Sequence, residues 1–224
     1  MCSSDLILAS RPSFARELLA GVERKQIPAA DLTPFHIRQI RSLGVPEIDG
    51  LITAVWGVAR ETPADKQRRI AALAAELRTA GSVDLGRGRQ LYQKHCGSCH
   101  RLYGEGGGIG PDLTGSGRHD LGYLLENMID PNAVVKGDWR MSLVELVDGR
   151  VLSGVVVEDR ERTLTLQSPT ERVVISRADI EKLTPTDRSP MPEGILDQLS
   201  PADIRDLVGY LRHPTQVPLP AAPR

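Results

Sequence analysis

The sequence predicts a mainly α-helical protein with a small antiparallel β insertion toward its C-terminal end. Two patterns in the chain support this class. Apolar residues recur every three to four positions through residues 7–82, as on one face of a helix. Between Trp139 and Ser176 the chain instead alternates and is rich in Val, Leu and Thr, as in half-buried strands. The chain has 224 residues, 40% of them hydrophobic and 25% charged, which allows one or two domains with a sizeable core.

Residues 1–82 are predicted to form an α-helical, repeat-like segment. Its apolar stripes lie near residues 14–22, 35–43, 48–58 and 70–77. Prolines and a glycine that stop or start helices separate these stripes, at Pro28, Pro34, Gly44-Val45-Pro46 and Pro63. Short helices joined by tight turns are typical of stacked helical arrays, although no fixed period is visible here.

Residues 83–213 are predicted to form a second unit, which a strand-rich insertion at 138–186 interrupts. Its helices are expected at 83–100, with Asp84 as N-cap, at 119–129, and from Ser200 onward. A loop with seven glycines occupies residues 104–117.

The insertion is predicted to contain four strands, at about 140–147, 150–158, 162–168 and 172–177. Asp148-Gly149 between the first two strands indicates a hairpin turn. A short helix is expected at 178–183. Residues 214–224 are predicted to be a Pro-rich tail, either disordered or a linker.

Charge and hydropathy exclude several functions. The net charge of −1 excludes nucleic-acid binding driven by bulk charge. The best apolar run, Leu51 to Ala59, is far shorter than the roughly 20 residues of a membrane span. Residues 1–20 also lack the pattern of a signal peptide. The opening residues, Met1 to Leu6, read like a translated sequencing-adapter tail. We therefore expect a fragment whose true start, with any export signal, is missing; the alternative is a genuine start codon, and Cys2 is given no function.

The motif that carries chemistry is Cys96-Gly97-Ser98-Cys99-His100. This CxxCH spacing is the attachment signature of c-type haem. Positions i and i+3 of a helical turn face the same side, so both thiols can reach one porphyrin edge. His100 follows directly and can bind the iron from below the ring. A thioredoxin-type redox pair, a zinc site that uses His95 or His119, and a chance match are the alternatives. They are disfavoured because no βαβ pattern precedes the motif and no second cysteine pair exists.

Around this motif, over about residues 83–213, the chain resembles class I cytochromes c. The resemblance implies a cytochrome c fold with covalently bound haem c and its iron. It rests on Gly88-x-x-x-Tyr92-x-x-x-Cys96-x-x-Cys99-His100, on Gly110-Pro111-x-Leu113 and on Leu207-x-x-Tyr210-Leu211. In that family a glycine of the first helix packs against the C-terminal helix near an aromatic residue, which implies Gly88 and Tyr210 here. The resemblance also implies that the Pro111 carbonyl accepts a hydrogen bond from the His100 imidazole.

The second axial ligand of the iron is expected to be Met191, which lies between Pro190 and Pro192. The resemblance places the distal methionine in such a loop, before the last helices. Met128 and Met141 are expected in the core instead, the latter on one strand face with Trp139 and Leu143. His119 is the alternative ligand, and the remaining histidines are expected at the surface: His36, His95 and His213.

A narrower resemblance concerns the whole arrangement of helices, haem motif and insertion. It is similar to the C-terminal haem-binding domain of large bacterial multidomain proteins, which often carry a dehydrogenase-like propeller upstream. The chain has no such domain, so the implied redox partner is an upstream dehydrogenase domain or a separate protein. The implied compartment is periplasmic or otherwise extracytoplasmic, because haem c is attached outside the cytoplasmic membrane.

The sequence favours electron transfer, and leaves other functions open. A Met/His-ligated iron suits an electron carrier. A peroxidase-like haem enzyme or a gas binder would need an exchangeable sixth ligand, and residues 7–82 could instead be an interaction scaffold. The insertion looks like a small Sm- or SH3-like barrel and is either a cover for the haem or a docking surface. The basic residues near the motif are either a solvated face or a rim that steers an acidic partner, with Glu105 the one nearby acid: Arg87, Arg89, Lys94 and Arg101.

Overall fold

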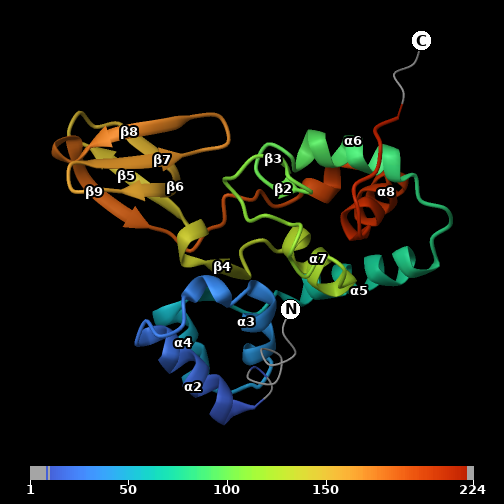
Figure 1. The fold of residues 1–224 in the computed structure, drawn as a ribbon, viewed down its shortest axis with the longest axis horizontal. Coiled ribbons are helices and arrows are strands. Elements are labelled where there is room, and N and C mark those ends of the chain that lie inside the picture. The colour runs from blue at the N-terminus through green and yellow to red at the C-terminus, as the bar shows by residue number, and fades with distance from the viewer. Residues whose placement is uncertain (1–8, 10, 221–224) are drawn as a thin grey trace.

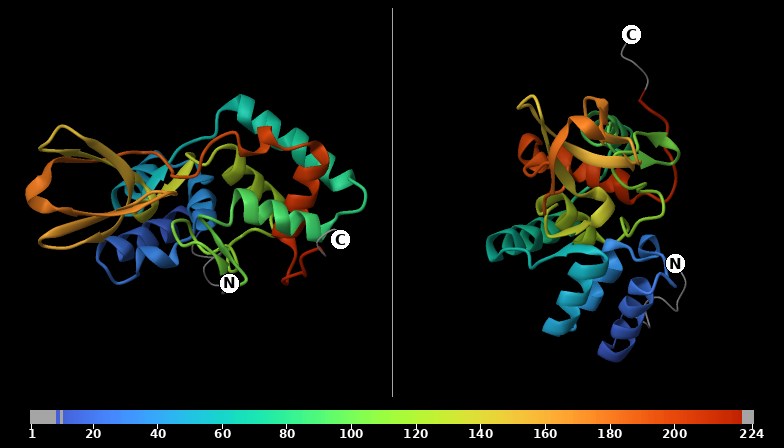
Figure 2. Two further views of the ribbon diagram at one scale, coloured as in Figure 1. Left: turned by 90° about the horizontal axis from the view of Figure 1, so that it is seen from above. Right: turned by 90° about the vertical axis from the view of Figure 1, so that its left-hand side faces the viewer.

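The computed structural model describes residue 9 and residues 11–220, and these form three lobes (Figure 1). One lobe holds helices α2 to α4, the second holds α5 to α8, and the third is a β-sheet. The left view of Figure 2 shows the sheet at one end of the molecule. The predictions for Met1, Cys2 and the end of the Pro-rich tail lie outside the described residues.

The described residues form seven α-helices. Their bounds are α2 (Pro12–Glu23), α3 (Pro34–Arg41), α4 (Pro46–Val55), α5 (Ala64–Thr79), α6 (Leu85–His95), α7 (Leu121–Ile129) and α8 (Pro201–Arg212). Side chains cap four of these helix starts by accepting a backbone N–H: Thr33 for α3, Asp84 for α6, Asp120 for α7 and Ser200 for α8. The predicted caps Asp84 and Ser200 are therefore confirmed.

Helices α2, α3 and α4 pack around one apolar core that includes Leu19, Ile40 and Ile52. The indole N–H of Trp56 donates to the Leu32 carbonyl at 2.8 Å and ties the end of α4 to this core. The helical-repeat prediction receives no support from this arrangement and stays a prediction.

A short strand ends this lobe where the pattern predicted helix up to residue 58. Strand β1 (Gly57–Ala59) pairs antiparallel with β4 (Val134–Lys136). Ala133 and Val134 are buried in the same core as α2 to α4. The N-terminal helices are thus joined to the segment that follows α7.

The second lobe has its own core, to which α6, α7 and α8 contribute. Helix α5 lies against α7 and buries Ala74 in that core, with Ile70 and Leu73 packed beside it. Residues 214–220, expected to be a free tail, also contact this lobe. Val217 packs against its core, and the Val217 carbonyl accepts a hydrogen bond from Arg89.

The third lobe is a five-stranded antiparallel sheet in the order β8-β7-β6-β5-β9. The strands are β5 (Met141–Leu146), β6 (Val151–Asp159), β7 (Thr163–Gln167), β8 (Arg172–Ser176) and β9 (Ile180–Pro185). The predicted hairpin at Asp148-Gly149 is confirmed, and Gly149 takes the left-handed conformation with φ of 85°.

Two predictions about this sheet were wrong. Residues 178–183 are not helical: the 3-10 turn η3 (Arg177–Asp179) leads into β9, which pairs with the free edge of β5. The sequence pattern of so short a run does not distinguish a helix from a strand. The free edge of β5 therefore determined that this run forms a strand. Met141 is half-buried and lies outside the sheet core, because alternation along β5 points Ser142 and Val144 inward instead.

Candidate haem site

The CxxCH motif forms the turn that follows α6. The backbone N–H groups of Cys99 and His100 both donate to the Cys96 carbonyl, at 3.1 and 2.9 Å, and so continue one helical turn. The two cysteines form no disulfide; Cys96 is 8% exposed and Cys99 is half-buried. Burial, with a smaller effect of Cys99, raises the pKa of the Cys96 thiol to about 12. Before haem is attached, the Cys96 thiol is therefore the protonated form at neutral pH.

The imidazole of His100 is held in one orientation. Its Nδ1 lies 3.0 Å from the Pro111 carbonyl oxygen, as the resemblance implied. Because a carbonyl only accepts, this contact requires the proton on Nδ1 and leaves the Nε2 lone pair for a metal. Burial lowers the pKa of His100, and the hydrogen bond to Pro111 opposes this only in part. The ring is thus kept in the neutral form that binds iron.

The glycine-rich loop wraps closely around this turn. Strands β2 (Arg101–Leu102) and β3 (Glu105–Gly106) pair to start the loop. The Gly110 N–H then donates to the Cys99 carbonyl at 2.8 Å. A Cβ atom on Gly110 would lie 2.5 Å from the His100 ring, so no other residue fits there without moving the ligand. The Tyr92 hydroxyl donates to the His100 carbonyl at 2.7 Å and braces the turn from the α6 side.

Helices α6 and α8 cross in close contact at Gly88. A Cβ on Gly88 would lie 2.1 Å from the Asp206 carbonyl oxygen and 2.7 Å from the Tyr210 Cβ. The Tyr210 ring also packs on Tyr92, with ring centroids 5.7 Å apart. The predicted packing of Gly88 near Tyr210 is confirmed.

Met191 lies partly buried against the same core as Cys96. Its backbone N–H donates to the Ser189 hydroxyl at 3.1 Å. Met128 is buried in the α7 part of that core, as predicted. His119 is exposed, and its Nδ1 lies 3.0 Å from the Arg212 carbonyl. Met128 and Met191 thus both lie at the core that contains Cys96, and His119 lies at the surface.

Two side chains differ from the expectations drawn from sequence. His36, expected at the surface, is only 4% exposed, because its Nδ1 accepts the Thr33 N–H in the capping box of α3. Arg118, which no sequence pattern singled out, is 2% exposed. Its guanidinium donates to the Leu211 and His213 carbonyls and so joins the loop to the end of α8.

The basic residues near the motif are partly neutralised. Arg89 makes two hydrogen bonds to the Glu105 carboxylate, at 2.9 and 2.7 Å. Arg87 pairs with Asp203 of α8, an acid distant in sequence. This pairing weakens the reading of a basic rim and favours a solvated, ion-paired face.

These features together define a c-type haem-binding unit: a CxxCH turn, a histidine oriented by a backbone carbonyl, and two helices crossed at a glycine. Residues 85–142 match the family model of cytochrome c. This match supports a cytochrome c domain, and such a domain implies a covalently attached haem c with its iron. The matched range includes the motif and Pro111 and ends before Met191 and α8. No curated protein matches the chain.

The side chains present suit that group. The motif supplies two thiols for the porphyrin edge and a neutral imidazole whose Nδ1 is already bonded. Among the described residues, no group of three or more His, Cys, Asp and Glu side chains is placed to hold a metal ion, so the zinc alternative gains no support. Within the described part of the chain, no helix has both the length and the apolar character needed to cross a membrane.

Proposed function

We propose that this protein carries single electrons through a haem c attached to Cys96 and Cys99, with His100 and Met191 as axial ligands. The observation that carries the proposal is the His100–Pro111 hydrogen bond beside the CxxCH turn. Bound haem supplies reversible one-electron chemistry at its iron. A histidine that is oriented and kept neutral is what the proximal position needs.

Met191 decides between a carrier and a catalyst. A thioether on the iron raises the reduction potential and fills the sixth position, so substrate does not reach the metal. Met191 packs against the core that contains Cys96, and both neighbours are prolines, which restrict its backbone. These two facts support Met191 as the distal ligand.

We further propose that residues 83–213 are the haem unit, with the sheet of 138–186 as an insertion and 1–82 as a separate helical segment. The close crossing of α6 and α8 on either side of the insertion supports this division. The electron donor would be an upstream dehydrogenase domain or a separate redox protein. Haem attachment of the c type places the mature protein in the periplasm or another extracytoplasmic compartment.

The test of this function is the Met191→Ala variant of the haem-loaded protein. We expect haem to stay attached while the thioether-to-iron charge-transfer band disappears, the potential falls, and cyanide binds the iron. Met128→Leu is the matched control, because it exchanges side chains of similar volume in the core and should cost less than about 1.5 kcal/mol. An unchanged band in Met191→Ala would place the ligand elsewhere. Ready cyanide binding and peroxide turnover by the wild type would favour the catalytic alternative.

A further inference from the structure

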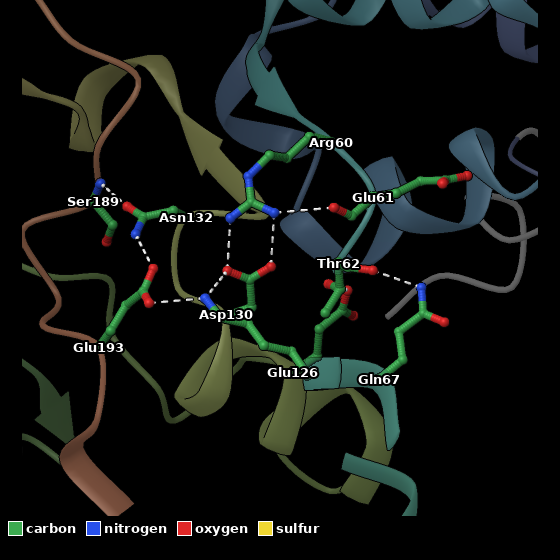
Figure 3. A network of polar contacts seen from close by, with 10 residues as sticks. Arg60, Glu61, Thr62, Gln67, Glu126, Asp130, Asn132, Ser189 and Glu193 are labelled. Atoms are coloured by element: carbon green, nitrogen blue, oxygen red, sulfur yellow. Dashed lines mark hydrogen bonds and ion pairs between the residues drawn. The ribbon is translucent and has the colours of Figure 1, made fainter. Parts of the chain in front are cut away.

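A buried carboxylate joins three distant parts of the chain (Figure 3). Asp130 directly follows α7, and its side chain is 0% exposed. Arg60, just after β1, donates two hydrogen bonds to it, at 2.9 and 2.7 Å. Lys66, in the first turn of α5, donates a third at 2.9 Å. Two cations from the N-terminal half of the chain therefore bind one carboxylate at the end of α7.

The contacts continue from Lys66 to the loop that contains Met191. The Lys66 ammonium also donates to Glu193 at 2.8 Å. The other Glu193 oxygen accepts a hydrogen bond from the Asn132 amide at 2.7 Å. The side-chain oxygen of Asn132, Oδ1, in turn accepts a hydrogen bond from the Ser189 backbone N–H at 2.9 Å. Glu193 and Ser189 stand two positions on either side of Met191, so the network holds the loop at both flanks (Figure 3).

Charge keeps this network intact. Burial by itself would raise the pKa of Asp130, but hydrogen bonds from Arg60 and Lys66 outweigh it, so the pKa lies below its ordinary value. The carboxylate therefore stays ionised and fixes the Lys66 ammonium. Hydrogen bonds between ionised groups are stronger than neutral ones.

The loop itself has little regular structure to hold it. Residues 186–194 form neither helix nor strand, and Pro190 and Pro192 have no N–H to donate. Backbone hydrogen bonds join the start of the loop to Met141, through the Thr186 N–H and the Arg188 carbonyl. The stretch around Met191 is held from outside by side-chain contacts. A thioether is a weak ligand of iron. It stays bound only if its loop is already held in place, because binding then costs little conformational entropy.

We propose that Lys66 and Asn132 are positioning residues for Met191, which hold its loop against the haem face. This inference rests on the proposed function, because it assumes that Met191 binds the iron. It assigns a role to the N-terminal half: Lys66 lies outside the segment that matches cytochrome c, and it stabilises the distal ligand through Glu193. Neither residue touches the iron.

The experiment compares haem-loaded, full-length Asn132→Ala and Lys66→Met with the wild type. Asn132 is partly exposed, and its truncation leaves no buried charge unpaired, so this variant retains the fold. We expect attached haem at the wild-type level, a weaker charge-transfer band, a lower potential and cyanide affinity raised about tenfold, the factor that about 1.4 kcal/mol produces. Lys66→Arg should restore the band, because a guanidinium can bond both carboxylates.

The matched control is Arg69→Met on the same helix. Arg69 pairs with Asp197 beyond the loop, but both side chains are largely exposed, 45% and 56%. We expect this variant to leave the band and cyanide affinity unchanged, since exposed ion pairs contribute little. An equal weakening in Arg69→Met would overturn the proposal, because packing of α5 would then be responsible.

These variants also distinguish the positioning role from the proposed function. If Met191→Ala abolishes the band while Asn132→Ala and Lys66→Met keep the wild-type band, potential and cyanide affinity, the positioning role is wrong and the proposed function stands. If Met191→Ala itself keeps the band, the proposed axial ligand is wrong. Loss of the band in Met191→Ala together with a weaker band in Asn132→Ala and Lys66→Met, with haem still attached in all three, supports both.

Discussion

The backbone of Gly88 on α6 lies directly against Tyr210 on α8, so close that a Cβ on Gly88 would be 2.7 Å from the Tyr210 Cβ. This contact sets how α6 and α8 cross. It also brings Tyr210 against Tyr92, whose hydroxyl bonds the His100 carbonyl. Gly88 is thus connected through the two tyrosines to His100, the proposed iron ligand.

Gly88→Ala should therefore destabilise the protein by about 1–3 kcal/mol, because the added methyl group forces the two helices apart. Urea unfolding of the haem-loaded protein measures this. Gly50→Ala on α4 is the control, since nothing lies within 4 Å of its Cβ position. That variant should gain about 0.5–1 kcal/mol, as Ala favours a helix over Gly. Equal stability of Gly88→Ala and wild type would contradict the close crossing.

Covalent attachment is tested with the two cysteines. Haem should remain with the wild-type chain through denaturing electrophoresis and acid-acetone extraction. Cys96→Ala and Cys99→Ala should each retain less haem, and the double variant none, because each thiol makes one thioether bond. If either single variant kept all of its haem after extraction, attachment through both cysteines would be wrong.

The compartment is tested by expression. Produced in the cytosol, the chain should accumulate without haem, with a loosely packed haem lobe that lacks its central apolar group. Helices α2 to α4, which have a core of their own, should persist, which far-ultraviolet circular dichroism detects. An added export signal together with haem-attachment factors should yield red protein. Red protein from plain cytosolic expression would contradict this expectation.

Acid should weaken the fold through Asp130. Its pKa in the folded state lies below 3.8, the ordinary value for Asp, so its contribution is present at neutral pH. That contribution is lost as the pH falls through the lowered pKa, because the unfolded chain binds the proton more readily. Urea unfolding across this range should show stability declining with acid.

The Asp130→Asn variant should lose that acid dependence. It should also be less stable at neutral pH by about 1–3 kcal/mol, the usual cost of leaving charged donors without their acceptor. Arg60 and Lys66 are those donors here. Asp138→Asn is the control, since that carboxylate pairs with Lys136 at the surface and is 79% exposed. An identical pH profile for Asp130→Asn and wild type would show that other groups control the acid transition.

By itself the sequence determined what depends on near neighbours. The CxxCH spacing predicted haem c, and the match to cytochrome c supports it. Alternation predicted strands β5 to β8 within about two residues, and Asp84 and Ser200 were identifiable as helix caps. These features depend on side chains at most a few positions apart, whose spacing is written directly in the chain.

Only the tertiary structure decided the features that need a distant partner. Residues 180–185 became a strand because β5 had a free edge, and β1 formed because β4 lay beside it. The Lys66–Glu193 contact joins residues 127 positions apart. No local pattern distinguishes such a lysine from one that is solvated, since its partner is brought near only when the chain folds. The chemistry of the haem motif was therefore readable from sequence, whereas the contacts that hold the Met191 loop were not.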